Sequence, residues 1–150
     1  VLVHTFPQDK IWPNTVEFQL EEGDCGDLIL MNTRCWPGGD LGGTPAWPNN
    51  ALSQKVPYPT GPNRPALERQ RLIKNGDFER RLDWNTVEVL AVGDKLAVLV
   101  NSRIVNTAYE LVGQDVNDRD LYTPLTKGRI GLEIEGAEVM FRNIQLRAFA

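Results

Sequence analysis

The sequence predicts an all-β fold, an antiparallel sandwich of two sheets, on the strength of three observations. The 150 residues include 13 glycines and 10 prolines, which interrupt many short runs of Val, Ile and Leu. Several of these runs alternate apolar and polar residues, the pattern of a strand with one buried face. Convincing 3.6-residue apolar periodicity, which would indicate amphipathic helices, is almost absent. Short strands with long connections are typical of a two-sheet sandwich.

Length and composition favour one globular domain over residues 1–150. The chain is 41% hydrophobic and 24% charged, with a formal net charge of −4. A chain of this size can bury a substantial core. Its Lys and Arg residues form no basic stripe, so a nucleic-acid partner is not expected. It has no apolar run of the roughly 20 residues that span a bilayer.

The first half of the chain supplies three predicted strands. Residues 1–6 begin directly as a strand. Residues 15–20 alternate most regularly, and residues 27–33 return antiparallel after a turn at residues 23–26. In the second strand three side chains are expected to face the core, Val16, Phe18 and Leu20, and two to face the other way, Glu17 and Gln19.

A long loop and a three-strand meander are predicted next. Residues 36–65 hold seven of the ten prolines and show no periodicity, and residues 68–81 are polar with a turn. The meander is predicted at residues 84–92, 95–100 and 103–108, with Trp84 in the core. Its turns are Gly93-Asp94 and Asn101-Ser102, and a polar loop at residues 111–127 follows.

The closing residues 128–147 predict two more strands. Three alternating residues, Ile130, Leu132 and Ile134, are expected to face the core, which turns Glu133 and Glu135 the other way. The apolar parity then switches between Phe141 and Ile144. A one-residue slip exchanges the two faces of a strand, so a bulge or sharp twist is predicted at Arg142-Asn143.

The two cysteines, Cys25 and Cys35, are predicted to be unbridged. The extended residues 27–33 between them would hold the two Cα atoms roughly 20–30 Å apart. A disulfide requires about 4.4–6.8 Å.

Four motifs occur in an order and spacing that resemble a known family. They are Glu17-x-Gln19, Trp84-Asn85, the turn at Asn101, and a closing signature that runs from Gly128-x-Ile130-Gly131-Leu132 through Glu135-Gly136 to Phe141-Arg142-Asn143-Ile144. Together they resemble the DUF1080 family, the 3-keto-disaccharide hydrolases. Two positions depart from the family pattern, because Glu133 replaces the usual Gln and Ser102 replaces the usual Gly.

The resemblance implies a concanavalin A-like jelly roll whose concave face binds an extended sugar. It implies a periplasmic or secreted bacterial protein, and family strands expected before Val1. Three groove carboxylates are the candidate catalytic residues, Glu17, Glu133 and Glu135. The candidate substrate-binding residues are His4, Gln19, Trp36, Trp47 and Arg142. His4 stands where the family places a cationic side chain.

The resemblance implies an enzyme that acts on 3-keto-glucosides or disaccharides, and two chemistries remain open. A carboxylate or His4 could remove the C2 hydrogen that a C3 ketone acidifies. Alternatively, two carboxylates could hydrolyse the bond directly, and Glu133 and Glu135 would stand roughly 6.5–7 Å apart on one strand. The rivals are a non-catalytic carbohydrate-binding module and an assembly domain.

No cofactor is expected, and calcium is kept as the alternative. Three aspartates, Asp24, Asp27 and Asp40, lie near one another in sequence and carry the oxygen ligands that calcium prefers. Their spacing does not match a dedicated calcium loop. The resemblance implies a carbohydrate as the partner, and an oligomer is left open.

Overall fold

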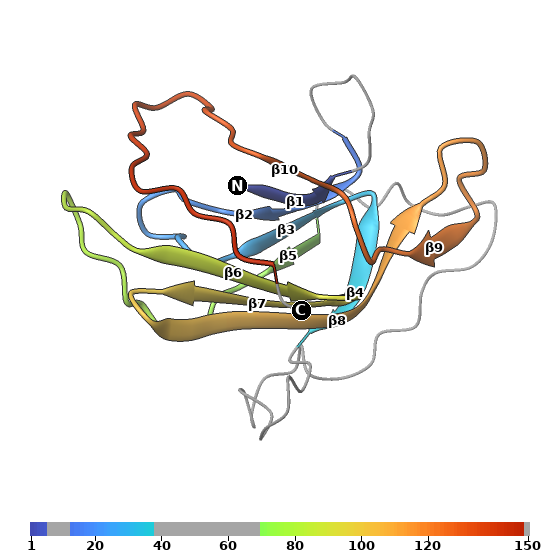
Figure 1. Cartoon of the computed structure of the whole chain (residues 1–150), viewed down its shortest axis with the longest axis horizontal. Helices are drawn as coiled ribbons and strands as arrows, with labels where there is room; N and C mark the ends of the chain where they lie inside the picture. Colours follow the sequence, from blue (N-terminus) through green and yellow to red (C-terminus); the bar gives the residue numbers. More distant parts are fainter. Residues whose placement is uncertain (6–12, 38–69, 149–150) are drawn as a thin grey trace.

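A computed structural model of the chain describes residues 1–5, 13–37 and 70–148, with the side chains of residues 36, 37 and 70 left aside. Within these ranges it contains strands and no helix, and none of the described residues form a helix that could span a membrane. All strand pairs are antiparallel. Figure 1 shows the strands in two layers, so the predicted all-β, two-sheet sandwich is confirmed.

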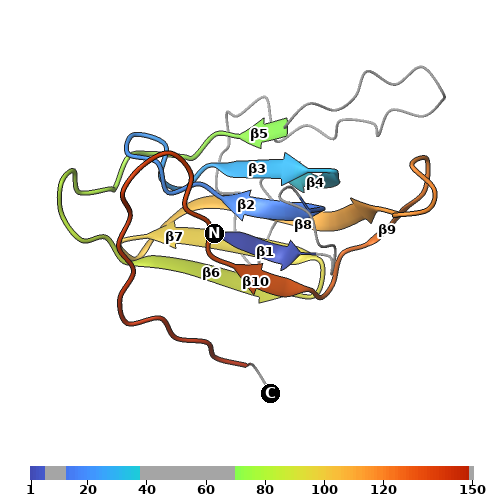
Figure 2. The same ribbon diagram turned by 90° about the horizontal axis from the view of Figure 1, so that it is seen from above.

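The first sheet brings the two ends of the described chain together. Its strand order is β10-β1-β2-β3-β5. The bounds in that order are Arg129–Gly131, Leu2–Thr5, Thr15–Phe18, Leu28–Met31 and Gln70–Leu72. Figure 2 looks onto the outer face of this sheet, with β10 and β5 at its two edges.

The second sheet is built around one long strand. Its order is β4-β8-β7-β6, and β9 also pairs with β8. The bounds are Thr33–Pro37, Arg103–Gln114, Lys95–Val100, Val87–Val92 and Tyr122–Pro124. Only Asn32 separates β3 from β4, and its φ of 51° turns the chain from the first sheet into the second.

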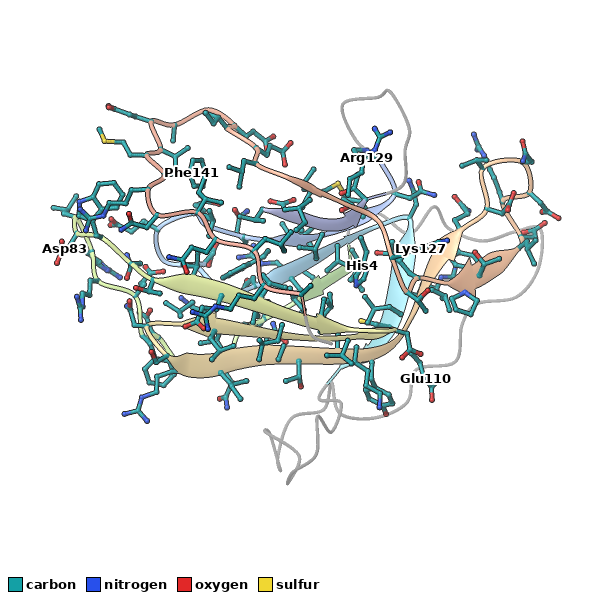
Figure 3. The ribbon with its side chains drawn as sticks, viewed as in Figure 1. His4, Asp83, Glu110, Lys127, Arg129 and Phe141 are labelled. Atoms are coloured by element: carbon teal, nitrogen blue, oxygen red, sulfur yellow. The ribbon has the colours of Figure 1, made fainter. Side chains whose placement is uncertain are left out.

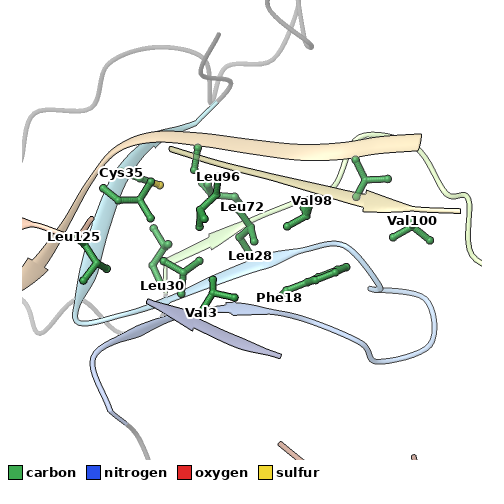
Figure 4. Close-up of a cluster of buried hydrophobic side chains, with 14 of the residues drawn as sticks. Val3, Phe18, Leu28, Leu30, Cys35, Leu72, Leu96, Val98, Val100 and Leu125 are labelled. Atoms are coloured by element: carbon green, nitrogen blue, oxygen red, sulfur yellow. The ribbon is translucent and has the colours of Figure 1, made fainter. Parts of the chain in front are cut away.

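The core lies between the two sheets and comes from alternate residues of their strands (Figure 4). Its largest fully buried apolar side chains are Phe18, Leu28, Leu30, Leu96, Leu111 and Leu125. A polar side chain also reaches across this core. Asn106 of β8 donates from Nδ2 to the carbonyl oxygen of Leu72 at 2.8 Å, which links the two sheets.

The most regular sequence patterns are confirmed as strands. β2, β3 and the meander β6-β7-β8 form where alternation or tight turns predicted them. Asn101 and Ser102 both have positive φ, 50° and 65°, as a two-residue hairpin turn of the primed type requires. The polar loop predicted at residues 111–127 is partly strand, because β8 extends to Gln114 and β9 lies within the same stretch.

The prediction for the end of the chain is wrong beyond Gly131. β10 ends there, and no further strand follows among the described residues up to 148. The alternating residues predicted in the core are exposed: Ile130 by 59%, Leu132 by 48% and Ile134 by 68%. Among the described strands β10 is a three-residue edge strand whose partner is β1, and the exposure of its apolar side chains shows that the core does not extend to them.

Trp84 and the two cysteines differ in how well the sequence predicted their environments. Trp84 is 40% exposed, so its assignment to the core is wrong. Cys25 and Cys35 are both free and buried, so the prediction that they are unbridged is confirmed. Burial raises the pKa of the Cys25 thiol to about 11 and that of Cys35 to about 12.

Candidate functional site

A row of five residues crosses the outer face of the first sheet. The strand registers place Gly131 opposite Leu2, Leu2 opposite Glu17, Glu17 opposite Ile29, and Ile29 opposite Arg71. In β1, β2, β3 and β5 the neighbouring residues point into the core, which fixes the row on the outer face. We call these five residues the Glu17 row. It runs from edge to edge of the sheet, with Glu17 at its centre.

The centre of the Glu17 row is buried although it faces away from the second sheet. Leu2 is 8% exposed, Glu17 8% and Ile29 7%, and Leu2, Ile29 and Met31 form an apolar cluster of their own. Glu17 therefore presents a carboxylate between two aliphatic side chains. Such surroundings exclude water, which favours chemistry that depends on a positioned carboxylate.

A second row on the same face is fixed by hydroxyl groups. The hydroxyls of Thr5 and Thr15 lie 2.9 Å apart, and Thr15 also donates to the carbonyl oxygen of Val3 at 2.9 Å. Thr15 stands two residues before Glu17 on β2 and is fully buried. These bonds hold β1 and β2 in register beside Glu17.

Glu133 comes close to the same centre. The backbones of Val1 and Phe18 exchange two hydrogen bonds, at 2.7 and 2.8 Å, which extends the pairing of β1 and β2 to Val1. Burial lowers the pKa of the Val1 amino group, and the charges of Glu17 and then Glu133 oppose this shift. Both carboxylates thus act on one nitrogen atom. The structure brings together these two of the three predicted catalytic residues.

Arg71 ends the Glu17 row at the opposite edge and is held by two carboxylates. Its Nε lies 2.5 Å from Asp27 Oδ2, and its Nη2 lies 2.5 Å from Asp24 Oδ2. Asp27 is buried and also accepts a bond from the Lys74 backbone nitrogen at 2.8 Å. The hydrogen bonds that Arg71 donates to Asp24 and Asp27 raise the pKa of its guanidinium. Arg71 is therefore a fixed cation.

The turn that carries Asp24 is held in place by residues that follow β5 in the chain. Glu79 accepts hydrogen bonds from the backbone nitrogens of Gly23 and Cys25, and Lys74 Nζ lies 3.4 Å from its Oε2. The side chain of Glu79 is only 3% exposed. The loop after β5 thus stabilises the turn whose Asp24 pairs with Arg71.

His4 lies at the far end of β1, in a bulge. Its φ is 52°, and the register of β1 with β10 shifts between Leu2 and Thr5. The side chain is 9% exposed, and its Nε2 has no hydrogen-bond partner in the described part of the chain. Burial lowers the pKa of His4, and a hydrogen bond with the Lys127 backbone partly opposes this shift. Both residues are labelled in Figure 3.

The remaining predicted site residues are less closely associated with this centre. Gln19 follows β2, and its Oε1 accepts from the backbone nitrogens of Leu20 and Glu21 at 2.9 and 3.2 Å. Glu135 is exposed beyond the end of β10, so the strand spacing assumed between Glu133 and Glu135 does not apply. Arg142 stacks over the ring of Trp84, with 3.9 Å between its Cζ atom and the ring centroid.

The two tryptophans predicted to stack on sugar are not among the residues that the structure places on the outer face of the first sheet. The backbone of Trp36 lies in β4 opposite Tyr109, which puts it in the second sheet. Trp47 lies outside the described residues.

No metal centre emerges from the part of the chain that the structure describes. It contains no group of three or more His, Cys, Asp or Glu side chains that could hold a metal ion. Asp24 and Asp27, two of the three aspartates weighed as calcium ligands, both bind Arg71. The third, Asp40, lies outside the described residues.

Arg71 was not singled out from the sequence. It lies in a charge-dense segment with no alternation, and β5 is only three residues long. The one available signal was Leu72, a lone apolar residue that faces the core and thereby turns its neighbour outward.

Comparison with known proteins identifies a family over nearly the whole chain. A family model described as the 3-keto-alpha-glucoside-1,2-lyase-like domain matches residues 1–147. Searches of curated proteins and of solved structures return no significant match.

Proposed function

The chain belongs to the family of 3-keto-alpha-glucoside-1,2-lyase-like domains, and on that basis we propose that it cleaves 3-keto-α-glucosides with Glu17 as the base. The observation that carries the proposal is the position of Glu17, a carboxylate at the centre of the Glu17 row that is only 8% exposed. Elimination is preferred to direct hydrolysis because the family description is that of a 1,2-lyase.

The chemistry follows from the ketone at C3. The Glu17 carboxylate takes the proton from C2, and the electron pair of the C–H bond forms an enolate with the C3 carbonyl. The enolate then restores the carbonyl, its electrons form the C1=C2 double bond, and the C1–O bond breaks. The leaving oxygen takes a proton from water, and Glu17 returns its proton to solvent. Later addition of water at C1 would give the free 3-keto sugar, so the net result would be hydrolysis.

Glu133 has a separate part in this proposal. It is half-buried, and its charge acts on the same amino group as that of Glu17. Carboxylates accept hydrogen bonds from sugar hydroxyls in a fixed geometry. Glu133 therefore holds the sugar beside the base, and Glu135, which is exposed, is assigned no step.

The proposal is tested by Glu17→Gln, which keeps the shape of the side chain and removes its basicity. Turnover of a 3-keto-α-glucoside should fall by about 10²–10⁴, the usual contribution of a positioned proton-transfer group. The matched control is Glu88→Gln, on an exposed residue of β6 in the second sheet, which should keep full turnover. Glu133→Gln should raise KM more than it lowers kcat.

Two results would contradict the proposal. Wild-type turnover in folded Glu17→Gln protein would remove Glu17 from the reaction. Binding of a 3-keto-α-glucoside or the ordinary glucoside by the wild-type protein without cleavage of either would instead identify a carbohydrate-binding module.

A further inference from the structure

We infer that Arg71 is a second residue that contacts the substrate, where it donates a hydrogen bond to the C3 ketone oxygen. This inference rests on the proposed function, because it assigns a partner to the carbonyl group that the elimination requires. Arg71 lies in the Glu17 row on the same face of the sheet, with Ile29 between it and Glu17.

The spacing of the Glu17 row suits one sugar ring. Glu17 and Arg71 are two strands apart, so their Cα atoms are roughly 10 Å from each other. The two side chains extend from the sheet on either side of Ile29, whose apolar side chain is a suitable floor for a ring. C2 and C3 are neighbouring atoms of that ring. A base at C2 and a donor at C3 therefore belong on opposite sides of the same sugar.

The guanidinium is held in place and keeps donors to spare. Nε and Nη2 are occupied by Asp27 and Asp24, while Nη1 has no hydrogen-bond partner in the described residues. Two carboxylates fix the plane of the guanidinium, and so the direction of the remaining N–H groups is fixed before substrate arrives. A donor that needs no reorganisation is the kind that best stabilises developing charge.

Exposure rises along the row from Glu17 to Arg71, towards the β5 edge of the sheet. The side chain of Arg71 is 41% exposed, whereas Glu17 and Ile29 are buried. A sugar that approaches from the β5 edge would meet Arg71 first and the base last. As the enolate forms, negative charge grows on the C3 oxygen, and the hydrogen bond from Arg71 becomes stronger.

The role of Arg71 is tested with Arg71→Gln, and with Arg103→Gln as the matched control on an exposed residue of β8. Loss of one donor to an oxyanion typically costs about 10²–10³ in kcat, and we expect this loss for Arg71→Gln on a 3-keto-α-glucoside. Added guanidinium ion should restore part of the rate. A change that acted only through stability would lower Tm without giving such rescue.

A binding measurement keeps the inference testable without turnover. Wild-type protein should bind the 3-keto-α-glucoside more tightly than the same glucoside with a C3 hydroxyl, and Arg71→Gln should lose this preference. If Arg71→Gln does not fold, Arg71→Lys retains one ion pair and should show the same loss. Unchanged turnover and unchanged ketone preference in a folded variant would overturn the inference.

Failure of the proposed function gives a different result. An active Glu17→Gln protein would refute the assigned base, and the ketone preference would still decide the role of Arg71. Wild-type protein that binds neither sugar would overturn both.

Discussion

Individual residues of the candidate site owe their properties to the side chains beside them. Glu17 lies between Leu2 and Ile29, and Arg71 lies between two aspartates, so one is kept from water and the other is fixed in direction. The alternation of β2 predicted the outward orientation of Glu17. It could not predict the pairing of Arg71, because that depends on a contact between residues 44 positions apart.

His4 is the chain's only histidine and makes stability depend on pH. Burial lowers its pKa below the ordinary value of about 6.5, so the unfolded chain binds a proton more readily than the folded one. Its contribution to stability is therefore complete above about pH 6.5 and is lost as the pH falls through the folded-state pKa. We expect Tm to drop between pH 7.5 and pH 5, and to drop less in His4→Gln.

The comparison of the two proteins isolates the histidine from other titrating groups. Thermal unfolding of both at the same set of pH values provides the measurement. An equal change in Tm for the wild type and His4→Gln would show that His4 does not cause the effect.

At the scale of elements, regular alternation and tight turns were sufficient for β2, β3 and the β6-β7-β8 meander. The same signal failed at the end of the chain, where Ile130, Leu132 and Ile134 alternate but are exposed. Alternation shows that a segment can present one apolar face. It does not show that another layer covers that face, which is decided by the arrangement of the whole sandwich.

The pairing of β10 with β1 depends on a close approach at Gly128. A Cβ atom at this position would lie 2.6 Å from the Cα of His4 and 2.7 Å from the nitrogen of Thr5, and would also meet the carbonyl carbon of His4. These are backbone atoms that cannot move aside cheaply. Gly128→Ala should therefore lower the free energy of unfolding by about 1–3 kcal/mol, the usual cost of overpacking.

Gly131, the last residue of β10, offers a control three residues further along the chain. A Cβ atom there would meet only the Leu2 side chain, at 3.5 Å, which is an ordinary contact. Denaturant unfolding of Gly128→Ala and Gly131→Ala should show a clear loss for the first and a much smaller effect for the second. Equal effects would mean that the close approach does not limit stability.

The whole molecule explains how residues far apart in sequence reach one face. Because β10 and β1 are neighbours in the first sheet, Glu133 comes near Val1 and Glu17, while β5 brings Arg71 to the other side of β3 (Figure 2). The family signature named Glu17 and Glu133 without the fold. The position of Arg71 in the same row required the strand order, which alternation alone does not determine.

The central claim is that Glu17 removes the proton from C2, and an isotope effect tests it most directly. The turnover of a 3-keto-α-glucoside that carries deuterium at C2 should be slower than that of the unlabelled sugar, because the C2–H bond breaks in the reaction. Glu17→Gln should be nearly inactive on both sugars. Equal rates for labelled and unlabelled sugar, together with full turnover by folded Glu17→Gln protein, would contradict the account.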